Sequence, residues 1–323
     1  MSDETRAATP QVLVLDVGLS TKPPFVQAGQ ILELNLGDHL RHPRVVVPQL
    51  SLPDGIAIDS AHKRMYWTCM GIPGKWDGTV HSAALDGTDR RTLVAPGRVN
   101  TPKQLALDES AGKIYFCDRE GLGVYRCNLD GLDFEPLVLN GEPTTPADAF
   151  KWCVGVVVAP ALGKFFWTQK GPSKSGQGRI FCANIVTPSG QSATSRDDIQ
   201  AVLQGLPEPI DLEFDEPSRA LYWTDRGEVP FGNSLNRAWL DESGMPRTIM
   251  TASLSLTGAK QEKKHELLTR NLNEAIGLKL DPSSGHIYIA DLGGSIYRYD
   301  LDGKKKERLY FEDSRAFTGI TIF

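Results

Sequence analysis

Five short aromatic segments recur through the chain, and their spacing constrains the fold more than any other feature. They lie at 65–69, 114–118, 165–169, 221–225 and 287–291, and they read MYWTC, IYFCD, FFWTQ, LYWTD and IYIAD. Aromatic and β-branched residues favour strands, and turn-forming residues precede each segment, as in DPSSG at 281–285. Self-similarity with a period of roughly 50 residues is typical of a propeller or another repeat array.

Each aromatic segment is the second strand of a predicted four-strand unit. In the first unit, residues 52–59 form the first strand, and 79–85 and 90–94 form the third and fourth, joined by an Asp-Gly turn. The same order begins again at Lys103, Cys153, Pro209 and Ala275. Four antiparallel strands of this kind make one propeller blade.

The two ends of the chain supply the sixth blade. Residues 317–323 match a first strand, and 12–18, 30–36 and 44–47 match the second, third and fourth. The sequence therefore predicts an all-β, six-bladed β-propeller of four-stranded antiparallel blades, closed by combining N-terminal strands with the C-terminal strand. This single domain spans residues 10–323 after a disordered tail at 1–9, and an insert at 252–265 is predicted as a mobile loop or a short helix.

Composition excludes several classes of partner. The net charge of −5 does not indicate nucleic-acid binding, and no apolar run approaches the ~20 residues of a membrane span. Residues 1–9 lack the pattern of a secretory signal. The five cysteines form no close pair and are interpreted as buried core residues, which predicts a reducing, cytoplasmic location. The sequence leaves the oligomeric state open.

The aromatic segments resemble the YWTD repeat of propellers in proteins of the low-density-lipoprotein-receptor type. The match is clearest at 222–225, followed by 66–68 and 166–168, whereas Cys69 and Gln169 stand where the repeat has aspartate. In that family the aromatic residues pack between blades and the aspartate ties strand to loop. The resemblance therefore implies a fold, and it makes the motif residues poor candidates for chemistry.

Long loops indicate where a site would lie. Residues 15–29, 71–77, 171–177 and 227–233 join second to third strands, 140–152 joins two blades, and all open on one face of a propeller. Loops of this length are usually functional. They carry apolar residues, which predict a funnel for apolar small molecules over the channel, unless each loop packs on itself. These residues are Phe25, Ile72, Trp76, Phe150, Trp152, Val229 and Phe231.

Charged residues at the ends of first and second strands give this face its candidate catalytic groups. A ring of cations would suit an anionic or enolate-like ligand, unless each charge is solvated or paired. The candidate catalytic residues are Lys103, Arg119, Glu208, Arg226, Glu274 and Arg315, with Glu208 or Glu274 for proton transfer. The candidate substrate-binding residues are Trp76, Lys151, Trp152, Phe231 and Phe317.

Three functions remain open from the sequence. The chain resembles in fold, length and loop style the stand-alone propellers of fungal secondary metabolism. These include hetero-Diels–Alderases that join a tropolone-derived ortho-quinone methide to a humulene-type sesquiterpene, which implies a biosynthetic enzyme without a metal or cofactor. A metal-dependent lactonase is the first alternative, with oxygen ligands from Asp54, Glu208, Asn273 and Glu274. A propeller that binds a protein or peptide without catalysis is the second.

Overall fold

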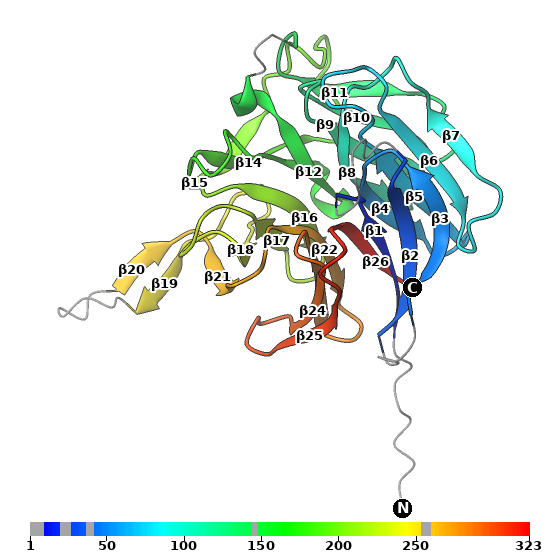
Figure 1. Ribbon diagram of the computed structural model, residues 1–323. Helices are drawn as coiled ribbons and strands as arrows, with labels where there is room; N and C mark the ends of the chain where they lie inside the picture. Colours follow the sequence, from blue (N-terminus) through cyan, green and yellow to red (C-terminus); the bar gives the residue numbers. More distant parts are fainter. Residues whose placement is uncertain (1–9, 20–26, 37–41, 144–147, 253–259) are drawn as a thin grey trace, which may run out of the picture.

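The computed structural model describes residues 10–19, 27–36, 42–143, 148–252 and 260–323. Within these residues, six four-stranded antiparallel sheets form the blades of a propeller, and the helical structure consists of two 3-10 turns, η1 (Ala149–Lys151) and η2 (Pro160–Leu162) (Figure 1). The predicted all-β, six-bladed architecture is confirmed.

The blades are numbered from the first complete one along the chain. Blade one consists of β4 (Pro53–Asp59), β5 (Arg64–Cys69), β6 (Thr79–Ala84) and β7 (Arg91–Val94). Blade two consists of β8 (Pro102–Asp108), β9 (Lys113–Asp118), β10 (Gly123–Asn128) and β11 (Glu135–Leu139). Blade three consists of β12 (Cys153–Ala159), β13 (Lys164–Gln169), β14 (Gly178–Asn184) and β15 (Gln200–Leu206), and all three blades are continuous in sequence. Blade four consists of β16 (Pro209–Asp215), β17 (Ala220–Asp225), β18 (Ser234–Trp239) and β21 (Glu266–Thr269). Blade five consists of β22 (Ala275–Asp281), β23 (His286–Asp291), β24 (Ser295–Asp300) and β25 (Lys306–Phe311). Blade six consists of β26 (Phe317–Ile322), β1 (Gln11–Asp16), β2 (Gly29–Asn35) and β3 (Arg44–Leu50).

Blade six closes the ring with strands from both ends of the chain. The last strand, β26, pairs antiparallel with β1, with Val12 opposite Ile322 and Val14 opposite Ile320. Figure 1 shows the C-terminus beside these N-terminal strands. Every blade then has a neighbour on both sides, as the sequence predicted.

The threonine of the aromatic repeat fastens three of the blades to the next one. Thr68 Oγ1 accepts a hydrogen bond from Gly55 N (2.9 Å) in its own blade and donates to Lys103 O (2.7 Å) in blade two. Thr168 and Thr224 make the corresponding bonds to the carbonyls of Ile210 and Ile276 (2.8 and 2.7 Å). The motif is thus structural at this position, because a buried hydroxyl satisfies backbone groups of two inner strands.

Inner strands approach one another too closely for side chains at some positions. A Cβ atom on Gly155 would lie 2.0 Å from Ile210 O, and one on Gly277 would lie 2.2 Å from Thr318 O. Glycine lets these backbones come together around the axis.

A layer of six side chains fills the hub near the loop face. Each inner strand contributes its second residue, and all six are 9% exposed or less: Asp54, Lys103, Val154, Ile210, Ile276 and Thr318. The three aliphatic members form a small apolar cluster with Leu292. The channel is therefore closed by side chains at this depth.

One prediction for the insert in blade four is wrong. The residues that flank its undescribed part, 253–259, form neither a helix nor an irregular loop but a two-stranded ribbon, β19 (Ile249–Ala252) paired with β20 (Lys260–Lys263). Figure 1 shows this ribbon extending outward from the rim. The predicted disordered tail at 1–9 and the loop residue Phe25 lie outside the described residues.

The five cysteines are free and buried, as expected for core residues. In the part of the chain that the structure describes, no helix is long and apolar enough to span a membrane.

Candidate functional site

Three cavities lie at equivalent places in three blades, each beside the tryptophan of an aromatic repeat. The cavities next to Trp67 and Trp167 measure about 350 and 360 Å³, and the one next to Trp223 measures about 910 Å³. Each is also lined by the residue two positions after the tryptophan, which is Cys69, Gln169 or Asp225. The third cavity, called here the Trp223 pocket, is the candidate site.

The three cavities differ in the residue opposite each tryptophan on the third strand. His81 faces Trp67 and Phe181 faces Trp167, and both rings stack on the indole at centroid distances of 5.4 and 5.5 Å. Asn236 faces Trp223 instead, and the ring beside that indole comes from His265, at 5.4 Å. The short amide and a histidine from another segment thus take the place of a cross-strand ring in blade four.

Loops of two blades and the segment after the ribbon form the walls of the Trp223 pocket. The wall segments are Lys174–Gly176, Gly205–Pro207, Glu228–Phe231, Lys263–Leu267 and Arg270. They include apolar side chains, among which Val229 and Phe231 are exposed by 60% and 64%, together with polar and charged ones. Two of the long loops that the sequence singled out, 171–177 and 227–233, therefore contribute to one pocket, but it lies off the propeller axis.

Basic side chains surround the mouth of this pocket. Lys174 is paired with Glu228 (2.9 Å) and Glu274 (3.4 Å). Among the described residues, Lys263, Lys264 and Arg270 have no carboxylate partner. A bound molecule with an electron-rich oxygen would find positive charge at this opening.

Three buried polar atoms of pocket-lining residues lack hydrogen-bond partners among the described residues: the indole nitrogen of Trp223, Oδ2 of Asp225 and Oγ of Ser175. Trp223 and Asp225 are fully buried residues. Burial raises the pKa of Asp225 to about 7. His265 packs against the Trp223 ring at 5.4 Å, and burial lowers the pKa of this histidine, so it is neutral at pH 7.

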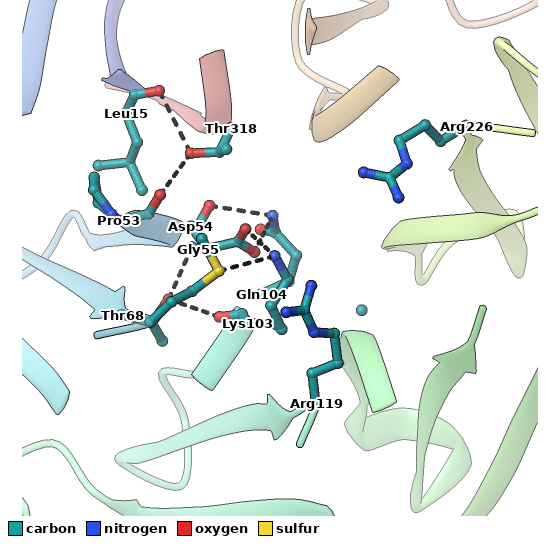
Figure 2. A network of polar contacts seen from close by, with 12 residues as sticks. Leu15, Pro53, Asp54, Gly55, Thr68, Lys103, Gln104, Arg119, Arg226 and Thr318 are labelled. Carbon is teal, nitrogen blue, oxygen red and sulfur yellow. Dashed lines mark hydrogen bonds and ion pairs between the residues drawn. The ribbon is translucent and has the colours of Figure 1, made fainter. Parts of the chain in front are cut away.

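A second cluster of charged residues lies at the axis and includes Asp54 and Lys103 of the hub layer. Lys103 Nζ is bonded to Asp54 Oδ2 and lies 3.3 Å from Met70 Sδ, and Gln104 Nε2 donates to Asp54 Oδ1 (3.1 Å). Burial lowers the pKa of Lys103, although Asp54 opposes that shift. Figure 2 shows the guanidinium ends of Arg119 and Arg226 directed from two sides toward the region of Lys103.

Glu208 is the buried anion of this axial cluster. It is 0% exposed and accepts hydrogen bonds from Lys170 Nζ (2.8 Å), Arg226 (2.7 Å) and the backbone N–H of Lys174 (3.0 Å). Burial alone would raise the pKa of Glu208, but Arg226 and Lys170 outweigh it, so this pKa lies below its ordinary value. An ionised carboxylate so enclosed is a poor proton donor, which corrects the proton-transfer role expected for Glu208.

The other charged candidates are also paired. Arg226 Nε lies 3.2 Å from Glu274 Oε2, which links two of them. Arg119 binds Glu120 (2.7 Å) and packs over the Trp152 ring at 5.1 Å, where Lys170 also lies at 5.2 Å. The axial cations thus bind carboxylates of the protein, which is the alternative to a ligand-binding ring of cations that the sequence left open.

The remaining predicted site residues do not gather at one opening. Arg315 bonds Asp16 (2.8 Å) in blade six, and Lys151 lines the smaller cavity beside Trp167. Trp76 is 44% exposed on the loop of blade one. Phe317 is 0% exposed in the core between blades, where it cannot contact a ligand, so the substrate-binding role expected for it is corrected.

The oxygens proposed for an axial metal ion are held by basic groups. Asp54 is bonded by Lys103, Glu208 by Lys170 and Arg226, and Glu274 by Lys174 and Arg226. Within the described residues, no three His, Cys, Asp or Glu side chains are grouped to hold a metal ion.

Sequence reasoning missed Asp225, Asn236 and the segment 263–270. Asp225 was set aside as a structural motif residue. Asn236 had a detectable signal, because aligning the third strands by register places it where two other repeats have His81 and Phe181. The segment 263–270 follows an insert for which the repeat gives no template.

Two relatives are similar in sequence over nearly the whole chain. No protein-family model matches it. "Low-density lipoprotein receptor-related protein 1" of Pyricularia oryzae is 42% identical over 320 residues, and the alignment covers 97% of each chain. "3-hydroxyacyl-CoA dehydrogenase-like protein LAM1" of Cochliobolus heterostrophus is 46% identical over 317 residues, which cover 97% of this chain but 64% of that protein.

Solved structures share the architecture at low identity. A chain in the crystal structure of a nidogen/laminin complex matches with a TM-score of 0.68 and 18% identity, covering 97% of this chain and 98% of that one. A gluconolactonase from Xanthomonas campestris matches with a TM-score of 0.57 and 14% identity, covering 98% and 91%. At such identities the likeness concerns the fold alone.

The fold and the repeats define a six-bladed β-propeller of the YWTD type. Because the Pyricularia oryzae protein is aligned over nearly its whole length, the chain belongs to the family of that low-density lipoprotein receptor-related protein 1.

Proposed function

We propose that this protein is a small-molecule biosynthetic enzyme whose substrate site is the Trp223 pocket. The observation that carries this proposal is a largely apolar cavity of about 910 Å³, lined by Trp223 and Asn236 and walled by two long loops. Ligand pockets in proteins measure roughly 300–1,000 Å³ and combine apolar walls with a few polar groups. This cavity has that size and composition.

The reaction that we propose is a hetero-Diels–Alder cyclisation, which joins a tropolone-derived ortho-quinone methide to a humulene-type sesquiterpene. Such a reaction needs two apolar partners held close in a productive orientation, and it needs little covalent help. Donors beside the quinone-methide oxygen would stabilise the charge that develops there. Trp223 N–H and the basic mouth, with Lys263, Lys264 and Arg270, are the groups suited to this role.

The dehydrogenase wording in the LAM1 name receives no support from this chain. Its sequence has no Rossmann glycine fingerprint between a strand and a helix. The described residues contain 3-10 turns as their only helices. The chain aligned with LAM1 thus lacks the features that would bind a nicotinamide cofactor in the usual way.

The test is incubation of the purified protein with humulene and an ortho-quinone methide generated in situ. The adduct is measured by chromatography with mass detection, and its enantiomeric ratio is determined. We expect faster formation of one enantiomer than in a protein-free control. A racemic adduct formed at the control rate would reject the reaction.

A protein-binding role is a second candidate, favoured by one observation. Val229 and Phe231 are exposed by 60% and 64% on the wall of the pocket, where a partner protein would also contact them. Exposed apolar patches mark interfaces as well as ligand grooves. If tropolone and humulene do not bind but changing Phe231 to serine removes binding of a purified partner, this role replaces the enzymatic one.

A further inference from the structure

The aspartates that end the second strands differ in how their oxygens are satisfied. In blade two, Asp118 Oδ1 accepts from Thr101 N (2.7 Å) and Oδ2 from Asn100 N (2.7 Å). In blade five, Asp291 Oδ1 accepts from Ser295 N (3.0 Å) and Oδ2 from Asn273 N (3.0 Å). In these two blades, both carboxylate oxygens therefore accept hydrogen bonds from the backbone.

Asp225 in blade four uses only one oxygen in this way. Its Oδ1 accepts from Glu208 N and Gly227 N, both at 2.9 Å, whereas Oδ2 has no partner among the described residues. A buried polar atom without a partner is costly and needs an explanation. A bound molecule would supply one.

The position of Asp225 links that free oxygen to the pocket. Asp225 and Trp223 are two residues apart on β17, so their side chains lie on one face of the strand, roughly 6–7 Å apart along it. Both line the Trp223 pocket, and the indole N–H of Trp223 also lacks a partner. The pocket wall thus presents an unpaired donor beside an unpaired carboxyl oxygen.

The two smaller cavities show that this arrangement is specific to blade four. At the position of Asp225 they have Cys69, with a pKa raised by burial to about 12, and Gln169, which accepts from Arg179 (2.8 Å). Their tryptophans also have unpaired indole nitrogens, Trp67 and Trp167. Of the three equivalent places, blade four alone combines the indole donor with an ionisable group near neutrality and an enlarged cavity.

We propose that Asp225 is the proton-transferring residue of the Trp223 pocket, and that it acts on an oxygen atom of the bound molecule that also accepts from the Trp223 indole. This inference rests on the proposed function of the same site. Protonated Asp225 gives its Oδ2 proton to a hydroxyl group of the ligand, the carbon–oxygen bond breaks, and water leaves. The carboxylate then takes a proton from the hydroxyl of the tropolone ring, which yields the neutral ortho-quinone methide and restores the acid.

Burial and neighbouring charges agree with that role. Asp225 is 0% exposed and lines the Trp223 pocket, so its Oδ2 is shielded from bulk water. The pKa of about 7 means that acid and base forms are both populated at neutral pH. The charged or titratable groups around it are Glu208, Arg226, Lys174, Glu228, Glu266 and His265.

The experiment compares Asp225→Asn and Asp225→Glu with Asp118→Asn, a matched change of the same motif residue in blade two. Asparagine at 225 can keep both backbone bonds through its remaining oxygen, so the variant should fold. Turnover is measured with a hydroxymethyl tropolone precursor and humulene between pH 5 and 9. Tropolone binding is followed in parallel by tryptophan fluorescence.

We expect Asp225→Asn to lower kcat at least 100-fold with KM within threefold of wild type, and to abolish the change in rate near pH 7. Glutamate should restore part of kcat, and Asp118→Asn should match wild type per folded molecule. Wild-type kcat and pH profile in Asp225→Asn would overturn the inference while leaving the cyclase proposal intact. If the wild-type protein shows no turnover but Asp225→Asn weakens tropolone binding about tenfold, only the cyclase proposal fails. If the wild-type protein shows no turnover and Asp225→Asn binds tropolone as tightly as wild type does, the inference about Asp225 is overturned as well.

Discussion

Asn236 is the cross-strand partner of Trp223, at the place where two other repeats pair a tryptophan with His81 or Phe181. The short amide lines the space of the cavity in blade four, which is more than twice as large as its equivalents. The substrate site that we propose is therefore a modified copy of a structural feature of the fold.

Filling that space should remove ligand binding without unfolding the protein. Asn236→Phe restores the ring found in blade three, and we expect tropolone affinity and cyclisation to fall at least tenfold. The lost bond from Asn236 to Ser234 (2.9 Å) should cost about 1 kcal/mol. Asn236→Ala, which loses the same bond but leaves the space open, is the control. Equal loss of binding in both variants would mean that ring size is not the cause.

The stability of the protein should depend on pH through Asp225. Its pKa is raised from 3.8 to about 7 on folding, so the folded state binds this proton more tightly than the unfolded state does. The resulting stability is fully present below pH 4 and is lost as the pH rises to 7, by up to about 4 kcal/mol. Denaturant unfolding of wild type and Asp225→Asn between pH 4 and 8 measures it. A difference between the two that does not change with pH would show that Asp225 has an ordinary pKa.

Removing one partner of the buried pair in the hub should destabilise the whole ring. Asp54 is 1% exposed, and its cation is Lys103, so Lys103→Met leaves a buried carboxylate without a counter-charge. Such a loss costs about 3–5 kcal/mol. The double variant Lys103→Met with Asp54→Leu removes both charges and should recover most of that free energy. If the single change left unfolding unaffected, the pair would not hold the hub together.

Truncation at the C-terminus should lower global stability rather than fray one edge. Deleting residues 317–323 removes β26, the inner strand of blade six, and exposes the edges of β1 and of the neighbouring inner strands. Amide exchange should then rise throughout the blades. Exchange confined to blade six, with an unchanged melting temperature, would contradict the closure that the structure shows.

The repeat made the fold predictable, and the differences between repeats made the site hard to predict. Aromatic segments, Asp-Gly turns and the missing strands of blade six were enough to place all six sheets, because strand pairing follows directly from a sequence period. Charged residues were expected around one opening, but sequence alone does not show that Arg315 pairs with Asp16 in blade six or that Glu208 is enclosed by Lys170 and Arg226.

The pocket escaped prediction for a physical reason. Its tryptophan faces Asn236, and this difference from the other repeats becomes visible only when strand registers are compared. Its outer wall comes from residues 263–270 after the β19–β20 ribbon, for which no other blade offers a template. Phe231 was the predicted substrate-binding residue that the structure does place at this wall.

The most direct test is a crystal structure of the protein with a cyclised tropolone–sesquiterpene adduct. Our account predicts the adduct in the Trp223 pocket, with one oxygen within hydrogen-bond distance of both the Trp223 indole nitrogen and Asp225 Oδ2. Density for the adduct over the axial cluster of Lys103, Arg119 and Arg226, with the Trp223 pocket empty, would contradict it.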